Sequence, residues 1–376
     1  VTRLKHMVGE EPPAPREASG AILTPKLNKH RDPAKRLVFP GVPEVDETRA
    51  LVTLLGRQDR PIIVGPWLTE TGFELLYWIP FLAWAKAYAN LHEDQLIVVS
   101  RGGAAPWYRH ISRHYHDILS LYSADEFRAR NEARVHEQKG RLKHVGLGAF
   151  DRDIVERVRK ARRLGKVKVL HPSVMYNLFN VFWRQQAPVT LIEAFSVFRP
   201  FLKLPLGDLA AHLPRDYVAV KFYANSALPD TAGNRAFIAA VMTELTRTTD
   251  VVLLNTGLRY DDHADFAPGR RERLHQVDHL MAPETNLEVQ TRIISGAKAF
   301  VGTYGGFSYL APFHGTGTTA YFSHPTAFRF DHLEIAKRVF SSLDTASFVP
   351  LDVKDLDVVR LGVGAAGVEQ PAVVRQ

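Results

Sequence analysis

The chain contains no cysteine among its 376 residues. Without thiols it can form no disulfide framework, and no thiolate can act as a nucleophile or a metal ligand. This composition fits a reducing compartment, and we expect a cytoplasmic protein. Long apolar runs are missing as well. The best candidate, residues 75–84, contains Pro80, is followed by Lys86, and is far shorter than the ~20 residues that span a bilayer. The first residues, VTRLKHMVGEEPPAPREASG, lack the apolar core of a secretory signal.

Acidic residues are fewer than basic ones, 40 against 48, which gives a formal net charge of +8 and a pI of about 9.5. Such a balance favours anionic partners, which include phosphates, nucleic acid and anionic membrane surfaces. The sequence has no helix-turn-helix pattern, RNA-binding aromatic motif or zinc-finger spacing, so we expect no nucleic-acid partner. A basic helix expected over residues 151–166 leaves open a peripheral contact with an anionic membrane surface.

Strand and helix patterns alternate along two successive segments of the chain. Residues 47–171 contain the apolar strand patterns RPIIVGP and QLIVVSRGG, separated by helical spacing. Residues 216–341 alternate in the same way, starting with DYVAVKFYANS. Residues 176–206, rich in aromatics and proline, are expected to form helices and a crossing linker. The pattern predicts an α/β fold with two Rossmann-like domains facing across a cleft, and ligands at the carboxyl ends of the strands.

The domain boundaries follow from composition. Prolines punctuate the first residues, and apolar periodicity is weak there. We therefore expect an irregular N-terminal arm at 1–48, a first Rossmann-like domain at 49–205, a second at 206–345, and a C-terminal extension and tail at 346–376.

One stretch, AFVGTYGGFSYLAPFHGTGTTAYF at residues 299–322, combines an apolar strand, a glycine turn, a short aromatic helix and another strand. Glycines at the end of a strand let backbone N–H groups approach a ligand, and the next helix turns its positive end toward that ligand. Such a turn would suit the diphosphate of a nucleotide. The alternative is an ordinary tight turn between a strand and a helix.

With the SGAKAFVG pattern at its start, this stretch resembles the donor-binding domain of GT-B glycosyltransferases, including heptosyltransferase-like and fucosyltransferase-like members. The resemblance covers this stretch well and the two-domain plan loosely. It implies a nucleotide-sugar donor in the second domain, an acceptor and catalytic base in the first, and no metal ion. The donor diphosphate would be surrounded by Thr303, Tyr304, Gly305, Gly306 and Ser308.

The helix that leads into this stretch would, by the same resemblance, hold the base and ribose of the nucleotide. Met281 precedes it and could offer backbone contacts to the base, and Glu288 lies near its start. For Glu288 the alternative is an acid that simply favours the positive end of the helix.

Further donor candidates follow two other strands of the second half. Lys221, near the end of YVAVKFYANS, could bind phosphate, or its ammonium could reach solvent or pair with a carboxylate. Asn225 and Ser226 come next, either as ligands or as a turn, and Arg235 opens the following helix, either facing the ligand or ion-paired. The strand DVVLLNTG ends in Asn255, Thr256 and Gly257.

Metal binding is not expected. The segment DDHAD offers Asp261, Asp262, His263 and Asp265, but it does not show the Asp-x-Asp pattern of metal-dependent GT-A enzymes. His110 and His114 have i, i+4 spacing without the glutamate of an HExxH motif, and we interpret them as a solvated helix face. We therefore predict no cofactor beyond the nucleotide-sugar co-substrate.

The acceptor candidates lie in the first half. In VGPWLTETGFELLYW a strand, a glycine turn and a helix again follow one another, with Gly65, Trp67 and Thr69 in the loop. Glu70 is the preferred catalytic base. Glu74 is the second candidate, although Thr71 and Glu74 also fit a capping box. The other acceptor candidates end the neighbouring strands: Arg101, Gly102, Gly103 and His171.

We predict a glycosyltransferase of polysaccharide biosynthesis that moves a sugar from a nucleoside-diphosphate sugar to a hydroxyl of a glycan or other acceptor, with inversion and without metal. One alternative is a transferase of similar shape that moves another group, such as pyruvyl, onto a glycan. The other is a non-catalytic protein that binds nucleotide or glycan. Selective stabilisation by a nucleoside diphosphate would separate the transferase from the binding protein.

Overall fold

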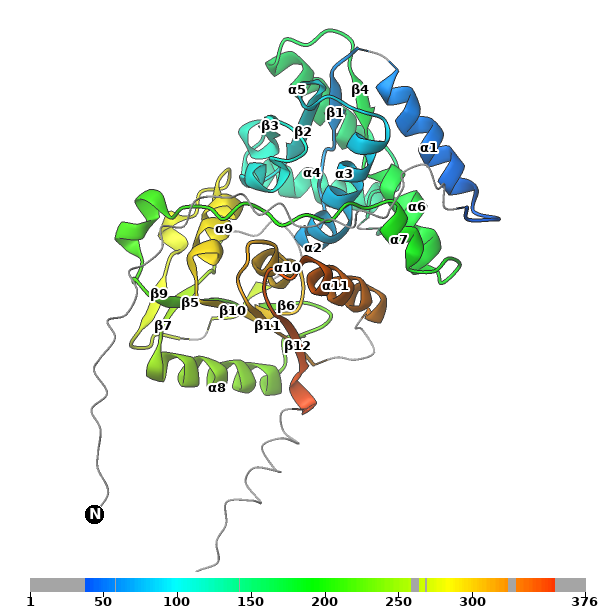
Figure 1. Ribbon diagram of the computed structural model, residues 1–376. Coiled ribbons are helices and arrows are strands. Elements are labelled where there is room, and N and C mark those ends of the chain that lie inside the picture. The colour runs from blue at the N-terminus through cyan, green and yellow to red at the C-terminus, as the bar shows by residue number, and fades with distance from the viewer. Residues whose placement is uncertain are drawn as a thin grey trace, which may run out of the picture. The chain divides into compact units, whose positions relative to one another are not determined.

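The computed structural model describes residues 38–57, 59–141, 143–257, 264–267, 269–323 and 329–355 (Figure 1). Both large β-sheets lie within the described residues from 39 onward, which belong to one compact unit. The predicted arm up to residue 37 and the tail after residue 355 lie outside the described residues.

The N-terminal half is built on a four-stranded parallel sheet with the order β3-β2-β1-β4. The strands are β1 (Ile62–Val64), β2 (Leu96–Ser100), β3 (His114–Asp117) and β4 (Lys168–Leu170). Ile62 and Val64 pack in one apolar cluster and Ile63 in another, because successive strand residues point to opposite faces.

Helices cover both faces of this sheet (Figure 1). The first cluster receives α1 (Pro43–Gly56), α3 (Ile79–Tyr88), α6 (Ser173–Trp183) and α7 (Thr190–Ala194). The second cluster receives α4 (Ala124–Glu137) and α5 (Ala149–Ala161). The sheet is therefore buried on both sides, as a parallel sheet normally is.

The C-terminal half is built on a six-stranded parallel sheet with the order β12-β11-β10-β5-β7-β9. Its strands are β5 (Tyr217–Lys221), β7 (Asp250–Leu253), β9 (Leu274–Gln276), β10 (Ala299–Thr303), β11 (Thr318–Phe322) and β12 (Phe348–Asp352). A separate antiparallel pair is formed by β6 (Tyr223–Ala224) and β8 (Ala264–Asp265).

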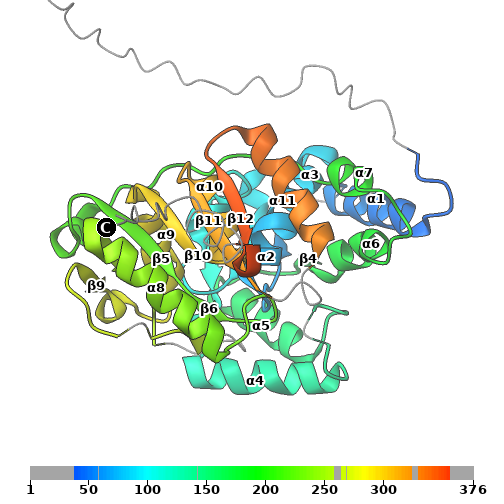
Figure 2. The ribbon, with the colours of Figure 1, turned by 90° about the horizontal axis from the view of Figure 1, so that it is seen from below.

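Helix α8 (Ala232–Thr248) covers one face of this second sheet, as Figure 2 shows. The other face is covered by α9 (Asn286–Gly296), α10 (Gly306–Phe313) and α11 (Phe330–Leu343). Their apolar residues belong to the same continuous cluster that covers the first face of the N-terminal sheet. The two halves thus share a core, and the predicted α/β fold with two Rossmann-like domains is confirmed.

Two elements extend beyond the predicted domain bounds. Helix α1 begins at Pro43, inside the predicted irregular arm, because proline suits the first helical position and Glu44 and Asp46 favour its positive end. Strand β12 lies inside the predicted C-terminal extension and pairs with β11 in parallel register. The region 176–206 does contain two helices followed by an extended crossing segment, as predicted.

The histidine pair at 110 and 114 is not on a helix face. His110 follows a short 3₁₀ turn, Ala105–Tyr108, and His114 is the first residue of β3. His110 is half-buried, and this burial lowers the pKa of its imidazole to about 4. The i, i+4 spacing was misleading because it implies proximity only within a helix.

Candidate active site

A cavity of about 330 Å³ lies between the two halves. The N-terminal half contributes the start of the helix after β1, the turn after β2, and Lys143. The C-terminal half contributes the turns after β5 and β10 and the first residues of α9 and α11. The cavity therefore sits beyond the carboxyl ends of the central strands, where open parallel sheets bind ligands.

Two glycines bring the cavity walls into backbone contact. A Cβ atom at Gly306 would lie 2.9 Å from the backbone N of Gly72 and 3.0 Å from the Cβ of Thr71. Gly306 begins α10, and Gly72 lies in α2 (Thr71–Phe73), which continues through the π-helical residues Glu74–Trp78 into α3. The N-termini of two helices therefore meet at the cavity, each with a partial positive charge.

Basic side chains outnumber acidic ones in the cavity lining. The basic residues are Arg101, Lys143, Lys221 and Arg329, and the acidic ones are Glu70 and Asp265. Lys143 pairs with Glu70 at 2.8 Å, and Lys221 with Asp265 at 3.4 Å. Together with the two helix ends, this excess of positive charge suits an anionic ligand.

Glu70 lies at the edge of the cavity, as the sequence predicts for a base on the loop before the helix. Its Oε1 accepts a hydrogen bond of 2.8 Å from Lys143 Nζ, and its side chain is 37% exposed. Lys143 Nζ also lies 3.4 Å from the centroid of the Phe73 ring. The carboxylate is thus held in one orientation at a surface that a ligand can reach.

Glu74 is fully buried and does not line the cavity. Ser100 Oγ and Tyr108 OH donate to its Oε1, at 2.6 Å and 2.5 Å. Burial raises its pKa to about 7, although nearby Arg101 lowers it. The capping-box interpretation is wrong, because the carboxylate bonds to β2 and to the turn after it rather than to Thr71.

Lys221 has a carboxylate partner, one of the alternatives that the sequence left open, and it also lines the cavity. Its ammonium donates to the backbone O of Leu254 at 2.8 Å and pairs with Asp265, so it does have a carboxylate partner. The side chain also lines the cavity and lies 5.0 Å from the centroid of the Phe307 ring. It brings a positive charge to the wall that also carries Gly305 and Gly306.

Several other donor candidates line the cavity. Asn225 uses its Oδ1 to close a turn, accepting from the N–H groups of Ala227 and Leu228, and its Nδ2 donates to the backbone O of Tyr304. The lining candidates are Asn225, Ser226, Thr256, Tyr304, Gly305 and Gly306.

The remaining donor candidates lie outside the cavity lining. Arg235 is exposed and ion-paired with Asp230, the alternative that the sequence offered. Three polar residues use their side chains within the fold: Asn255 donates to Phe266, Thr303 bonds to the backbone of Tyr223, and Ser308 caps α10 through Gly305. Gly257, Met281 and Glu288 also fall outside.

Of the acceptor candidates, only Arg101 and Gly102 line the cavity. Gly103 donates its N–H to Asp117, and Gly65 donates its N–H to Leu170. Trp67 is buried and stacks on Trp78 and Tyr176, while Thr69 Oγ1 bonds to Tyr176 OH. These four residues shape the loops rather than face a ligand.

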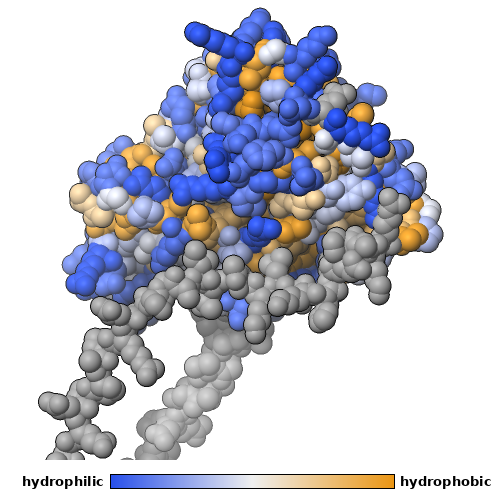
Figure 3. Space-filling view, turned by 45° about the horizontal axis from the view of Figure 1, so that its top comes forward, coloured by the Kyte–Doolittle hydropathy of each residue, from blue (hydrophilic) through white to orange (hydrophobic). Residues whose placement is uncertain are grey.

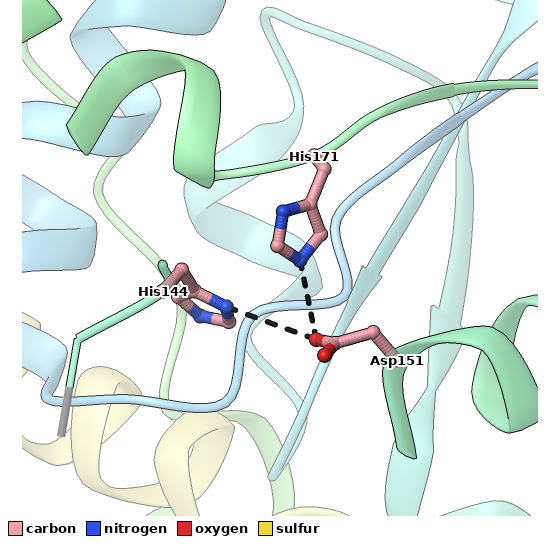
Figure 4. Close-up of side chains that lie close together, drawn as sticks. All are labelled: His144, Asp151 and His171. Carbon is pink, nitrogen blue, oxygen red and sulfur yellow. Dashed lines mark hydrogen bonds and ion pairs between the residues drawn. The ribbon is translucent and has the colours of Figure 1, made fainter. Parts of the chain in front are cut away.

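His171 belongs to a buried cluster with His144 and Asp151 (Figure 4). His171 Nε2 lies 3.2 Å from Asp151 Oδ1, His144 Nδ1 lies 3.8 Å from the same oxygen, and the three candidate ligand atoms fall within 4.8 Å of one another. In number and spacing this donor set fits a metal ion.

The hydrogen bonds on the far side of each ring do not fit a metal ion. The backbone N–H of Leu68 donates to His144 Nε2, and that of Ser173 donates to His171 Nδ1. Each neutral imidazole then carries its proton on the nitrogen that faces Asp151, where a metal would need a lone pair. We interpret the cluster as a carboxylate that accepts from His171, beside a neutral His144 whose pKa burial lowers.

The other metal candidate was DDHAD. Asp261, Asp262 and His263 lie outside the described residues. Asp265 is engaged by Lys221 and by the backbone N–H of Thr256. The prediction that no metal is needed stays a prediction.

The cavity residues that the sequence analysis did not predict include Lys143, Tyr77, Arg329 and His332. The Tyr77 hydroxyl hydrogen-bonds His332 Nδ1 across the two halves, and burial lowers the pKa of His332 to about 4. Lys143 and Arg329 lie in segments without strand or helix, so no strand end marks them. His332 lies near the start of α11, a helix-start position that could have been considered.

Among the described residues, no helix has the length and apolar character to cross a membrane. On the face seen in Figure 3, hydrophobic residues form separate patches among hydrophilic ones.

The chain has a distant structural match to GT-B glycosyltransferases. Escherichia coli heptosyltransferase WaaC with ADP shares 12% identity over 81% of this chain and 99% of its own, with a TM-score of 0.38. A family 9 glycosyl transferase from Veillonella parvula shares 11% over 83% and 91%, with a TM-score of 0.41. Escherichia coli ADP-heptose LPS heptosyltransferase II shares 13% over 76% and 97%, with a TM-score of 0.37.

No protein-family model and no curated protein sequence matches the chain. At such low identities these matches concern the fold alone and carry no argument about donor, acceptor or activity.

Proposed function

We propose that the protein is a glycosyltransferase that moves a sugar from a nucleotide-sugar donor to a hydroxyl of a glycan or other acceptor, with inversion and without a metal ion. The observation that carries the proposal is the cavity at the Gly72–Gly306 contact, where two helix N-termini meet amid four basic and two acidic side chains. A diphosphate is the kind of anion that such a surface binds.

For the donor, we assign the diphosphate to the turn at Gly305 and Gly306 and to Lys221. The positive end of α10 and the ammonium would stabilise the nucleoside diphosphate as it leaves. Asn225 and Ser226, on the same wall, would hydrogen-bond phosphate or sugar oxygens.

For the base, we assign Glu70. Its carboxylate would take the proton of the acceptor hydroxyl while that oxygen attacks the anomeric carbon, and the bond to the diphosphate oxygen would break on the opposite face. The hydrogen bond from Lys143 fixes one carboxylate oxygen and leaves the other to receive the proton. This single displacement inverts the configuration at the anomeric carbon.

The first test is ligand binding, measured as a shift in melting temperature with UDP, GDP, ADP and CMP. We expect selective stabilisation by one nucleoside diphosphate. Stabilisation by none of them would contradict the donor assignment and favour the non-catalytic alternative.

The second test is turnover, measured as release of nucleoside diphosphate from nucleotide sugars. Lys221→Ala should raise the KM for the donor about tenfold or more, because a hydrogen bond from a charged group is lost. The KM for the acceptor should change far less. An equal effect on both constants would assign Lys221 a purely structural role.

A further inference from the structure

Arg101 is a buried cation without a hydrogen bond among the described residues. Its side chain is 7% exposed and lines the cavity, and its Nη1 is buried with no hydrogen-bond partner there. The closest carboxylate oxygen recorded for it is Glu74 Oε2 at 4.0 Å, too far for a hydrogen bond, and that oxygen has no partner either. A guanidinium with unused donors is costly to bury unless a ligand engages them.

The acids around Arg101 do not neutralise it fully. Burial raises the pKa of Glu74 to about 7, so at neutral pH this carboxyl is protonated in a large share of molecules. Asp117, the other acid that influences Glu74, already accepts from the N–H groups of Gly103 and Leu119 and from Tyr115 OH. Positive charge therefore remains at the guanidinium.

The turn that carries Arg101 packs against the C-terminal half of the protein. Gly102 O accepts a hydrogen bond of 2.7 Å from the backbone N of Leu287, at the start of α9. A Cβ atom at Gly102 would lie 2.9 Å from Asn286 Nδ2, and one at Gly103 would lie 2.9 Å from the backbone O of Glu284. Both glycines have positive φ, +68° and +78°, a conformation that L side chains rarely adopt. The two glycines thus allow this turn to pack closely against the start of α9.

We propose that Arg101 is a donor ligand: its guanidinium binds phosphate oxygens of the nucleotide diphosphate, reaching from the N-terminal half into a site whose other ligands belong to the C-terminal half. This inference rests on the proposed function and replaces the assignment of Arg101 to the acceptor. Because the turn binds α9, donor affinity depends on contact between the halves. A planar guanidinium can donate two parallel hydrogen bonds to a phosphate, which a lysine cannot.

The test is calorimetric titration of the full chain with inorganic pyrophosphate. Arg101→Gln should weaken pyrophosphate binding about tenfold or more, and Arg101→Lys should weaken it less, because the charge remains while the paired hydrogen bonds are lost. Arg235→Gln is the matched control, since it removes one positive charge at an exposed residue outside the cavity lining. Unchanged affinity in a folded Arg101→Gln variant, or equal loss in the control, would overturn the proposal.

A second variant, Glu74→Gln, keeps Arg101 and should change pyrophosphate affinity in the opposite direction to Arg101→Gln. The charged or titratable groups that influence Glu74 are Arg101, Tyr108, Asp117, Tyr115 and Tyr176. At pH 8 the wild-type carboxylate opposes the anion, so Glu74→Gln should bind pyrophosphate several-fold more tightly than wild type. At pH 6 the ratio of the two affinities should approach one. A ratio that does not change with pH, or weaker binding at pH 8, would contradict a role for Arg101 in anion binding.

A competition experiment, in which the nucleotide displaces pyrophosphate, tests this inference separately from the proposed function. The nucleoside diphosphate that stabilises the protein should compete with pyrophosphate, and Arg101→Gln should weaken both. If the nucleotide binds without displacing pyrophosphate, Arg101 serves a different oxyanion and the donor assignment is wrong. If pyrophosphate binding depends on Arg101 but no nucleotide binds, the glycosyltransferase proposal fails while the oxyanion site stands.

Discussion

Glu70 and Glu74 stand four residues apart, and each lies near one basic side chain, yet the two pairs differ in every physical respect. In the Glu70–Lys143 pair, Oε1 and Nζ are 2.8 Å apart and form a hydrogen bond, and both side chains are about one third exposed at the cavity edge. In the Glu74–Arg101 pair, Oε2 and Nη1 are 4.0 Å apart, too far for a hydrogen bond, and both side chains are almost completely buried. A hydrogen-bonded pair at the surface leaves its carboxylate in contact with solvent, whereas a buried pair that is too far apart to bond leaves a cation with unused donors.

This difference explains why the two glutamates should serve different steps. Glu70 can exchange a proton with a bound acceptor because the cavity reaches it. Glu74 cannot, since Ser100 and Tyr108 enclose it, but it influences the charge that Arg101 presents to the cavity. Under the proposed function, the same residue type would act on the acceptor in one place and on the electrostatics of the donor site in the other.

The largest expected effect is on turnover. Glu70→Gln should lower kcat ~100-fold or more while leaving donor affinity and melting temperature nearly unchanged, because a positioned base contributes roughly 10²–10⁴ in rate. Glu74→Gln is the matched control and should retain most of kcat. Full turnover in Glu70→Gln would remove the distinction between the two residues and direct the search for the base to His332.

The next effect is on the pH dependence of stability. The folded pKa of Glu74, about 7, lies above its ordinary value of 4.5, so the folded state binds a proton that the unfolded state releases. This contribution is complete below pH 4.5 and is lost as the pH rises through 7, by about 3 kcal/mol in all. Glu74→Gln removes the titration, so its stability relative to wild type should increase between pH 5 and pH 8. Denaturant unfolding at several pH values would reveal it, and a constant difference would speak against a raised pKa.

A smaller effect is expected at the contact between the two helix starts, which lies close to Glu70. Gly306→Ala places a Cβ atom against Gly72 and Thr71, which lie between the two glutamates in sequence. We expect a loss of stability of ~1–3 kcal/mol, as for overpacked contacts, and weaker nucleotide binding. Gly146→Ala is the control, because a Cβ atom there meets nothing within 4 Å. If both variants behave alike, the contact between the helix starts is not tight in solution.

The smallest expected effect is that of metal removal. The His144–Asp151–His171 cluster has the spacing of a metal site, but the N–H groups of Leu68 and Ser173 occupy the outer ring nitrogens. Treatment with EDTA should change neither melting temperature nor turnover. If EDTA abolishes activity and Mn²⁺ restores it, the protein needs a metal ion. The assignment of Lys221 and Arg101 as the groups that balance the donor's negative charge would then also be in question.

Local patterns in the sequence predicted the fold and part of the site. Strand, glycine turn and helix follow one another in both halves, and this order was enough to place Gly306 and Glu70 at the cavity. Burial of Glu74 could not be predicted in this way. Its pattern with Thr71 satisfies a local rule, but Ser100 and Tyr108, distant in sequence, provide the actual partners.

Contacts between the two halves could not be predicted from the sequence either. Arg101 was correctly expected at a strand end facing the cleft, but its position against α9 depends on the docking of Gly102 and Gly103. Lys143 and His332 became visible only because tertiary packing brings them beside Glu70 and Tyr77. Periodicity describes the neighbours of a residue along its own element and says nothing about these partners.

A crystal structure of the wild-type protein with the stabilising nucleoside diphosphate would test the central claim most directly. We predict that the diphosphate lies at the Gly72–Gly306 contact, within hydrogen-bond distance of the backbone N–H of Gly306, Lys221 Nζ and the Arg101 guanidinium, with Glu70 facing the position of the anomeric carbon. A diphosphate bound outside the cavity, or bound there with Glu70 on the far side from the sugar position, would contradict the account.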